Sequence, residues 1–472
     1  MARRDNRYLP LEELTALTPL DGRYRSQLAQ LATYLSEYSL IRVRIEVEAK
    51  FLSALTSHGV IRSFTPAEKK LLESLGPETT LADERKVKHI EERTKHDVKA
   101  VEIYLREKLS TTSLKDVVEM IHFGLTSEDV NNLSYRLMLK RALENVILPS
   151  LETLLTTLVS LSEEYKATPM LARTHGQAAI PTTLGKELVV FAYRLAKEIS
   201  RLRSLQFSGK LAGAVGNYNA LSVAYEKVNW PEFAKTFLKD LDFSQSLATT
   251  QTNMYEDIIS FFQIFQRINN ILIDFDQDMW RYISDGWFVQ EVKREEIGSS
   301  TMPQKVNPIR FENSEGNLGM GNAMIEFFVR KLPISRLQRD LSDSTVIRNF
   351  GSALGYSLLA YQATLDGLTR VKPNLQKIEE DLLEDWSILA EAAQTILRKN
   401  GVNDPYSLLK GLTRGEKITK ARWKEIIQTL HIEEGTKKSL LSLSPKKYIG
   451  LAPEIVEQTL EEIEKSRVTP KV

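Results

Sequence analysis

The long stretches without proline constrain the fold of this chain more than any other feature. No proline lies between Pro77 and Pro149, and only Pro231 lies between Pro181 and Pro303. Because proline lacks a backbone donor and breaks helix interiors, stretches that are free of it can form long uninterrupted helices. In a chain of 472 residues, this pattern favours an architecture built from long helical rods.

Apolar residues inside these stretches recur at intervals of three and four residues, which is the spacing of one helix face. Three such series are Leu151, Leu154, Leu158 and Leu161; Leu188, Phe191, Leu195, Ile199 and Leu202; and Ile258, Phe262, Phe265, Ile268, Leu272 and Phe275. No strand-like alternation of comparable length accompanies them. The sequence therefore predicts an all-α protein whose long helices form a bundle, a type that partner subunits often complete.

Segments of small and polar residues interrupt the helical periodicity and predict loops at 213–219, 244–252 and 298–308. From these breaks we expect three helical domains. They are an N-terminal domain of residues 1–125, a central long-helix bundle of residues 126–370 that carries the third loop, and a C-terminal domain of residues 371–472.

Composition excludes several classes of function. The 63 lysines and arginines balance the 62 aspartates and glutamates, so no global field attracts nucleic acid or a membrane. The absence of cysteine excludes disulfides, thiolate metal ligands and cysteine nucleophiles. The N-terminus lacks the apolar core of a secretory signal, and no stretch approaches the ~18 uninterrupted apolar residues of a spanning helix. We therefore expect a cytoplasmic, soluble protein with no nucleic-acid or membrane partner.

The six histidines can be considered one by one. Three of them lie among polar and small residues: His96, His122 and His175. A single histidine is more often a hydrogen-bonded structural residue than a catalyst, so none of the three identifies a site by itself. The other three have charged or polar neighbours and are predicted to lie at the surface: His58, His89 and His431.

The segment 298–308 (GSSTMPQKVNP) is the least ordinary in the chain. Its glycine and hydroxyl residues can expose backbone donors, its two prolines prevent a helix, and Lys305 adds a cation. This combination suits anion binding, although a mobile surface loop is an equally good interpretation of the composition alone. Further on, Arg336, Arg339 and Arg348 with nearby hydroxyls suit phosphate or carboxylate recognition, and the alternative is a solvated helix face with ordinary ion pairs.

The pattern G-S-S-x-M-P-x-K-x-N-P in this segment resembles the signature of the fumarase/aspartase superfamily. Within that superfamily, several other segments resemble the adenylosuccinate lyase family in its bacterial branch. They are DGRY at 21–24, KHDV at 95–98, TSED at 126–129, RTHGQ at 173–177, GAVGNYN at 213–219 and QRDLSDSTVIR at 338–348. The resemblance is colinear and covers essentially the whole chain.

This resemblance implies a carbon–nitrogen lyase of purine biosynthesis. Such an enzyme releases fumarate by β-elimination from adenylosuccinate, which gives AMP, and from succinylaminoimidazole carboxamide ribotide, which gives the carboxamide ribotide. The resemblance also implies a homotetramer in which the central helices of four subunits form a twenty-helix core. In this arrangement the active sites are shared between subunits, and neither a cofactor nor a metal is needed.

The resemblance also implies a role for each matching residue. His175 resembles the general acid, Ser299 the base, and Glu312 the carboxylate that orients the acid. Lys305 and Asn307 resemble the groups that hold the fumaryl carboxylates, and Lys305 would also assist the serine. The remaining matches are to substrate-binding positions: Thr126 and Ser127 for a succinyl carboxylate; His96, Asp97, His122 and Gln251 for the nucleotide; and Arg23, Tyr24, Arg339, Ser344 and Arg348 for the 5′-phosphate and ribose.

The sequence departs from the family pattern at Gln304, where adenylosuccinate lyases commonly carry histidine. Glutamine there is more typical of argininosuccinate lyase, which stays the alternative enzyme. The substrate of argininosuccinate lyase has no phosphate, so the arginines near residues 23 and 339–348 would have no phosphate group to bind. A non-enzymatic helical scaffold is a third interpretation. A scaffold would tolerate substitution of the acid, the base and the cation, whereas His175, Ser299 and Lys305 are all present.

Overall fold

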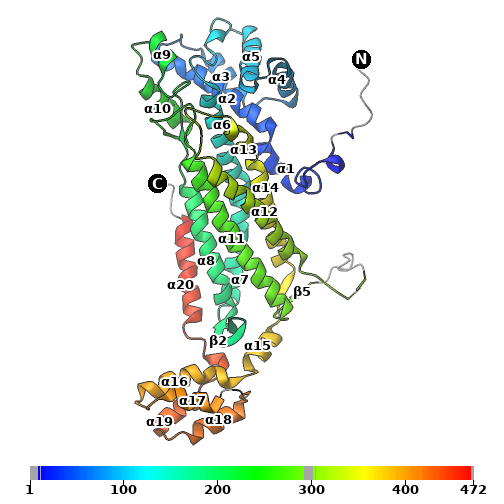
Figure 1. Cartoon of the computed structure of the whole chain (residues 1–472), viewed down its shortest axis with the longest axis vertical. Helices are drawn as coiled ribbons and strands as arrows, with labels where there is room; N and C mark the ends of the chain where they lie inside the picture. The colour runs from blue at the N-terminus through cyan, green and yellow to red at the C-terminus, as the bar shows by residue number, and fades with distance from the viewer. Residues whose placement is uncertain are drawn as a thin grey trace. The chain divides into compact units, whose positions relative to one another are not determined.

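The computed structural model describes residues 9–10, 12–291, 301–302, 304–413, 415 and 417–468. Helices account for 67% of the chain, and the strands form short two-stranded pairs (Figure 1). The all-α prediction is therefore confirmed. The chain divides into two compact units: unit 1 comprises Met1–Leu151, Arg201–Asn270 and Gly316–Tyr361, and unit 2 comprises Glu152–Ser200, Ile271–Glu315 and Gln362–Val472. The three-domain boundaries at residues 125 and 370 stay a prediction.

Unit 1 contains the N-terminal helices and the short elements of the middle of the chain. Its first elements are η1 (Glu13–Thr15), α1 (Arg25–Leu35), α2 (Glu37–Ala54), η2 (Leu55–His58), α3 (Pro66–Leu75), α4 (Leu81–Thr94), α5 (Asp97–Ser110), η3 (Val118–Met120), α6 (Ser127–Ala142) and the π-helical turn η4 (Leu143–Ile147). The later ones are β3 (Ser208–Gly209), α9 (Asn219–Ala224), α10 (Trp230–Asp240), β4 (Ser244–Gln245) and α13 (Ser342–Ile347). Strands β3 and β4 are parallel, with Ser208 opposite Ser244.

Local sequence signals explain where these helices begin. Helices α3, α4 and α6 each start with a capping box, in which Thr65, Thr80 and Thr126 exchange hydrogen bonds with the acidic residue three positions later. Two orphan amides are satisfied at each start, so the chain enters the helix at a fixed residue.

Five long helices lie in the described middle part of the chain: α7 (Leu148–Glu164), α8 (Leu184–Ser204), α11 (Glu256–Ser284), α12 (Ile309–Lys331) and α14 (Phe350–Leu368). The three apolar series predicted as helix faces lie in α7, α8 and α11, so these predictions are confirmed. In unit 1, the ring of Phe262 lies 5.2 Å from Phe328 and 4.9 Å from Phe350. In unit 2, the rings of Phe191 and Phe275 lie 5.2 Å apart.

Unit 2 contains two antiparallel strand pairs and the C-terminal helices. The pairs are β1 (Pro169–Thr174) with β2 (Gln177–Thr183), and β5 (Phe288–Gln290) with β6 (Val371–Pro373). The helices are α15 (Leu375–Leu383), η5 (Trp386–Leu389), α16 (Ala390–Lys399), α17 (Pro405–Thr413), α18 (Lys420–Thr429), α19 (Glu434–Leu441), η6 (Pro445–Lys447) and α20 (Ala452–Val468). Helix α20 lies along α7 and α8 (Figure 1), where Arg467 pairs with Glu152 of α7 and the Tyr193 hydroxyl of α8 donates to Glu462.

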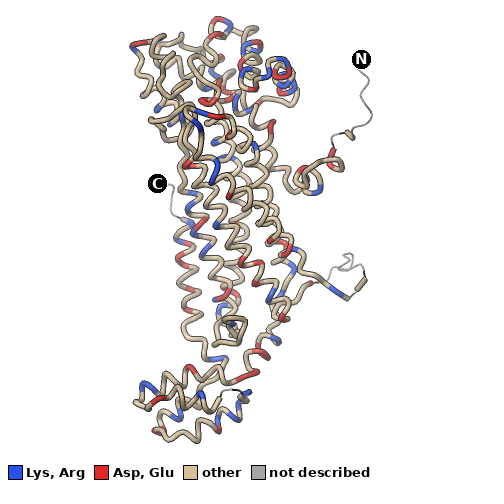
Figure 2. The backbone as a smooth tube through the Cα atoms, in the orientation of Figure 1, with Lys and Arg blue, Asp and Glu red and all other residues tan. Residues whose placement is uncertain are grey.

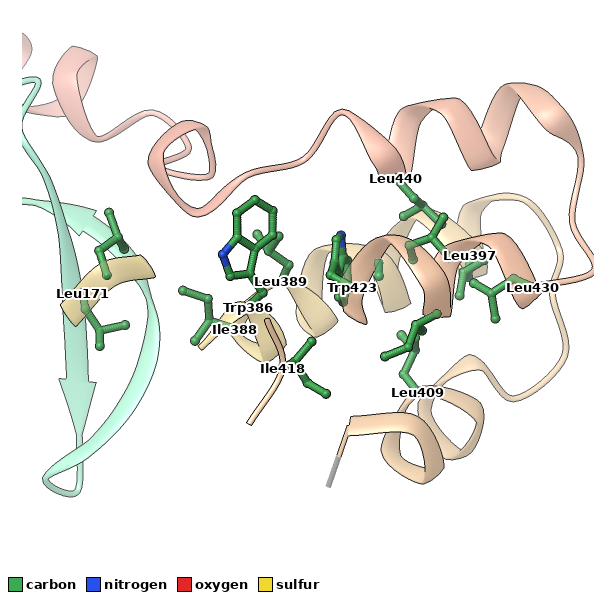
Figure 3. Close-up of a cluster of buried hydrophobic side chains, with 14 residues drawn as sticks. Leu171, Trp386, Ile388, Leu389, Leu397, Leu409, Ile418, Trp423, Leu430 and Leu440 are labelled. Carbon is green, nitrogen blue, oxygen red and sulfur yellow. The ribbon is translucent and has the colours of Figure 1, made fainter. Parts of the chain in front are cut away.

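A buried apolar cluster holds the C-terminal helices together (Figure 3). Trp386, Leu389 and Trp423 are at its centre, and Leu171 reaches it from strand β1. Burying such side chains contributes about 1.5–3 kcal/mol each, which gives this part of unit 2 a core of its own.

The run from α6 through α7, Ser127–Glu164, is long and apolar enough to cross a membrane by length and composition alone, with a mean hydropathy of 1.3. Core helices of water-soluble proteins meet the same criterion. Only 39% of its most apolar window is buried within the single chain. Charged residues are spread over both units (Figure 2).

Candidate active site

In unit 1, the start of helix α5 joins three of the predicted residues. His96 is the N-cap of α5, and its Nδ1 accepts a hydrogen bond from the Lys99 amide at 3.2 Å. The next residue, Asp97, uses Oδ2 to bind two guanidinium groups, that of Arg44 at 2.8 Å and that of Arg348 at 3.1 Å. Two residues predicted from separate motifs, Asp97 and Arg348, are therefore in direct contact.

The paired arginines control the charge of Asp97. Burial favours its neutral form, but the charge and hydrogen bond of Arg44, followed by Arg348, outweigh burial and lower the pKa of Asp97 to about 2. Arg348 also binds Glu37 at 3.2 Å. A cavity of about 280 Å³ lies beside this group, and its lining includes Asp21, Arg25 and Arg348.

The predicted phosphate residues Arg23 and Tyr24 lie just before helix α1. The guanidinium carbon of Arg23 is 5.9 Å from the centre of the Tyr24 ring. Arg23 is exposed and Tyr24 is half-buried. The next residue, Arg25, lines the cavity that Asp21 and Arg348 also line, so the DGRY motif and the QRDLSDSTVIR motif lie near one another.

Thr126 and Ser127 begin helix α6, and both are half-buried. The Asp129 carboxylate anchors this helix start by accepting the Thr126 amide at 2.8 Å. The same carboxylate, fully buried, accepts the Lys210 ammonium at 2.8 Å and the Gly213 amide at 3.0 Å. The TSED motif is thus tied to the start of the GAVGNYN motif.

The GAVGNYN loop also contacts the segment that carries Gln251. The Gln251 Nε2 donates to the Ala214 carbonyl at 3.1 Å. Gly216 has a φ of 78°, and a Cβ atom there would lie 2.4 Å from the Thr249 carbonyl oxygen. Only glycine permits this approach, so two loops predicted separately lie side by side.

His122 is half-buried, and its Nδ1 lies 2.5 Å from Glu48 Oε1. Burial by itself would lower the pKa of His122, but the hydrogen bond and charge of Glu48 outweigh burial, so the pKa of His122 is raised. The backbone of His122 is left-handed, with a φ of 59°, and Gly124 follows with a φ of 67°. Local strain in this tight segment is typical of functional sites.

Arg339 and Ser344 lie around the start of α13. Arg339 Nη2 is 3.1 Å from Glu128 Oε2 and 3.5 Å from Asp343 Oδ1. The Ser344 amide donates to the same Asp343 oxygen at 2.7 Å, and the Tyr255 hydroxyl donates to the other at 2.9 Å. The two acids thus hold Arg339 in one orientation.

In unit 2, His175 lies at the tip of the β1–β2 hairpin. Thr174 and Gln177 close the turn, in which His175 and Gly176 adopt left-handed φ values of 54° and 71°. The imidazole is exposed, and it makes no hydrogen bond to any residue that the structure describes. It therefore has no hydrogen-bond partner among the described residues of its own unit.

Glu312 lies in the first turn of α12 and accepts a hydrogen bond from the Trp280 indole N–H at 3.1 Å. Lys305, exposed, and Asn307, half-buried, precede this helix. Gln290 Nε2 donates at 3.1 Å to the carbonyl of Val306, which lies between them. Ser299 lies outside the described residues. No hydrogen bond or ion pair joins His175 and Glu312 within the described part of unit 2.

Known proteins match this chain over nearly its whole length. A family model described as Lyase matches residues 22–324, and one described as Adenylosuccinate lyase C-terminal matches residues 335–449. The adenylosuccinate lyase of Haemophilus influenzae is 45% identical over 95% of this chain and 100% of the relative, and that of Escherichia coli K12 is 43% identical over the same shares. The chain belongs to the adenylosuccinate lyase family.

Solved structures of two other enzymes share the fold. The 3-carboxy-cis,cis-muconate lactonizing enzyme of Pseudomonas putida has a TM-score of 0.73 at 18% identity, covering 93% of this chain and 98% of that one. The β-carboxy-cis,cis-muconate cycloisomerase of Acinetobacter calcoaceticus has a TM-score of 0.70 at 16% identity, covering 92% and 98%. At such low identity the likeness concerns the fold alone.

Several residues that contact predicted site residues were not predicted from the sequence. Arg44 and Glu37 flank the Asp97–Arg348 pair, Glu48 holds His122, and Trp280 holds Glu312. No motif marks them, because each comes from an ordinary helix face. Glu128 is different: it stands inside the TSED motif, so its position in the family pattern could have drawn attention to it.

Proposed function

We propose that this chain catalyses the β-elimination of fumarate from adenylosuccinate and from succinylaminoimidazole carboxamide ribotide. The observation that carries the proposal is the near-complete coverage, at 41–45% identity, by relatives named adenylosuccinate lyase. The match of residues 335–449 to the family's own C-terminal model favours this enzyme over argininosuccinate lyase. We expect it to work in the cytoplasm, in the formation of AMP and of the purine ring.

The chemistry requires cations and donors around two anionic ends of the substrate. Removing a proton from the succinyl Cβ builds charge on the neighbouring carboxylate, so that carboxylate must be stabilised. We assign this work to Thr126, Ser127, Lys305 and Asn307. Arg348 and Arg339 would bind the 5′-phosphate, because a guanidinium matches phosphate geometry with paired hydrogen bonds.

We assign proton transfer to His175 as general acid and Ser299 as base. The departing nitrogen needs a proton as the bond breaks, and an imidazole titrates in the right range to supply it. A serine hydroxyl is a weak base, so it needs a neighbouring cation, for which Lys305 is the candidate. Glu312 would orient His175, and Trp280 fixes one oxygen of that carboxylate.

We further propose a homotetramer whose active sites combine residues from several subunits. Two features support it: His175 is exposed and without a hydrogen bond to any described residue, and long helices carry large apolar side chains at the surface of the single chain. Examples of the latter, each 38–52% exposed, are Val190, Trp280, Met320 and Phe327. An interface would bury such residues and bring His175 to partners on another chain.

The proposed activity is tested by an absorbance assay of the purified protein with adenylosuccinate, run beside argininosuccinate and with chromatographic detection of fumarate. We expect AMP and fumarate from the first substrate and nothing from the second. Fumarate from argininosuccinate alone would overturn the assignment, and no product from either would favour a scaffold role. In that case AMP plus fumarate should also leave the thermal midpoint unchanged, because no ligand binds the folded state.

A further inference from the structure

Glu128 lies where two proposed binding regions of unit 1 meet. It follows Thr126 and Ser127 in the first turn of α6, and only 1% of its surface is exposed. Its Oε2 lies 3.1 Å from Arg339 Nη2, although the two residues are more than two hundred positions apart in sequence. The carboxylate therefore links the proposed succinyl-binding helix start directly to the proposed phosphate-binding arginine.

The contacts of Arg339 are one-sided. Its Nη2 donates a hydrogen bond to Asp343 and forms an ion pair with Glu128, whose Oε2 accepts no hydrogen bond, and Nε is buried without a hydrogen bond. Nη1 makes no hydrogen bond to a residue that the structure describes, and it is not among the buried atoms. The protein thus holds one edge of the guanidinium and leaves the Nη1 end available for an anion, which is the geometry of a preorganised phosphate donor.

We propose that Glu128 is a positioning residue that orients the Arg339 guanidinium toward the substrate phosphate and fixes its distance from the start of α6. This inference rests on the proposed function, because it assigns Arg339 to the phosphate and Thr126–Ser127 to the succinyl group. Glu128 itself touches no substrate. It makes the enzyme selective for substrates that carry both anionic ends at the right separation.

The charges around Glu128 make this link sensitive to pH. Burial is the largest influence and raises the pKa of Glu128 to about 7, while Arg339, Lys210 and Arg136 oppose it and Asp343 adds to it. The Tyr255 hydroxyl also faces this cluster through Asp343. Above about pH 7 Glu128 is ionised and holds Arg339 by charge, and below it the proton weakens the pair.

The test uses the full-length enzyme, with Glu128→Gln to remove the charge while keeping the shape. Activity of the wild type with adenylosuccinate is established first, so that failure of the proposed function is recognised separately. For the variant at pH 8 we expect KM and the dissociation constant of AMP to rise about tenfold, because the ion pair that orients Arg339 is lost, with kcat much less affected. The affinity for fumarate, which has no phosphate, should not change.

Three comparisons make the result specific. In a double-mutant cycle, Glu128→Gln should have no further effect on AMP affinity in an Arg339→Lys background. Lowering the pH from 8 to 6 should reduce the AMP affinity of the wild type more than that of Glu128→Gln. The AMP phosphate titrates equally with both proteins, so the difference between them reports on Glu128. Glu68→Gln, which breaks the ion pair at 2.9 Å between a buried glutamate and the exposed Arg62, should leave AMP affinity unchanged.

Two outcomes would overturn the inference. Equal losses of AMP and fumarate affinity would mean that Glu128 only stabilises the start of α6. Unchanged AMP affinity in a folded Glu128→Gln enzyme would mean that Arg339 is oriented without it. If Glu128→Gln does not fold, Glu128→Asp is used instead, because it keeps the charge on a shorter side chain. The inference then requires that Glu128→Asp lowers the affinity for AMP more than the affinity for fumarate.

Discussion

At the scale of single residues, Trp280 offers a direct test of how the Glu312 carboxylate is held. We expect Trp280→Phe to lower kcat roughly fivefold with little change in KM, because one hydrogen bond to a charged group is lost and the carboxylate can turn. Steady-state kinetics with adenylosuccinate measures both values. Phenylalanine keeps an aromatic ring at this position, so the replacement should cost little stability.

A matched control exists in the same unit. The Tyr193 hydroxyl donates to Glu462 at 2.8 Å, also from a helix surface to a carboxylate, and neither residue belongs to the proposed site. Tyr193→Phe should leave kcat unchanged. If Trp280→Phe still lowers kcat in a Glu312→Gln background, the effect does not pass through that carboxylate.

The His122–Glu48 pair predicts a pH dependence of stability. The pKa of His122 is raised, so its contribution is complete below the unfolded value of about 6.5 and is lost as pH rises through the folded value. Glu48→Gln should therefore destabilise the protein more at pH 6 than at pH 9. Urea unfolding at both pH values measures the difference, and an equal loss at both would show that the imidazole is not charged in the folded protein.

Sequence patterns predicted the chemistry-bearing residues but not the residues that contact them. The family resemblance assigned Asp97 to the nucleotide and Arg348 to the 5′-phosphate and ribose, and the structure brings these two residues into contact at 3.1 Å. Arg44, which sets the charge of Asp97, could not be predicted, because a charged residue on a helix is usually solvated. Only the tertiary fold places Arg44 within 2.8 Å of Asp97.

At the scale of elements, the buried Asp129–Lys210 pair joins helix α6 to the GAVGNYN loop. Asp129→Asn should destabilise the protein by about 3–5 kcal/mol, because it leaves the Lys210 ammonium buried without a counter-charge. It should also abolish activity by releasing Thr126 and Ser127. Equilibrium unfolding in urea measures the first effect and the standard assay the second.

An exposed pair provides the contrast. Glu232 and Lys235 lie 3.7 Å apart on the surface of α10, and Glu232→Gln should cost less than about 1 kcal/mol. Similar losses for Asp129→Asn and Glu232→Gln would mean that the buried pair does not lock the loop to the helix.

The long helices were predictable and the short strands were not. Periodicity over many residues identified α7, α8 and α11, because each buries one continuous apolar face. The β1–β2 hairpin carries His175, yet its strands of six and seven residues include prolines and alternate only weakly. Pairing between these strands, rather than their sequence alone, makes them extended.

At the scale of the whole molecule, the apolar surface of the single chain argues for assembly. Leu247, Met254 and Ile309 are each 42–63% exposed, and isolated residues of this kind are normal on a monomer. The continuous run Ser127–Glu164, however, leaves most of its most apolar window unburied. A sequence can indicate that such a helix needs a partner, but the partner's identity and symmetry depend on shapes that periodicity does not encode.

The proposed sharing of sites predicts that two inactive variants restore each other. His175→Ala and Ser299→Ala should each abolish turnover while leaving the tetramer intact, because each removes one proton-transfer group. If His175 and Ser299 of one site come from different chains, equal amounts of the two variants, dissociated and reassembled at random, should give about a quarter of the native activity.

Light scattering verifies the tetramer, and mass spectrometry under native conditions verifies mixing. Each variant taken alone through the same cycle is the control and should stay inactive. Verified mixed tetramers without activity would place both groups of a site on one chain, because every chain in the mixture then lacks one of them.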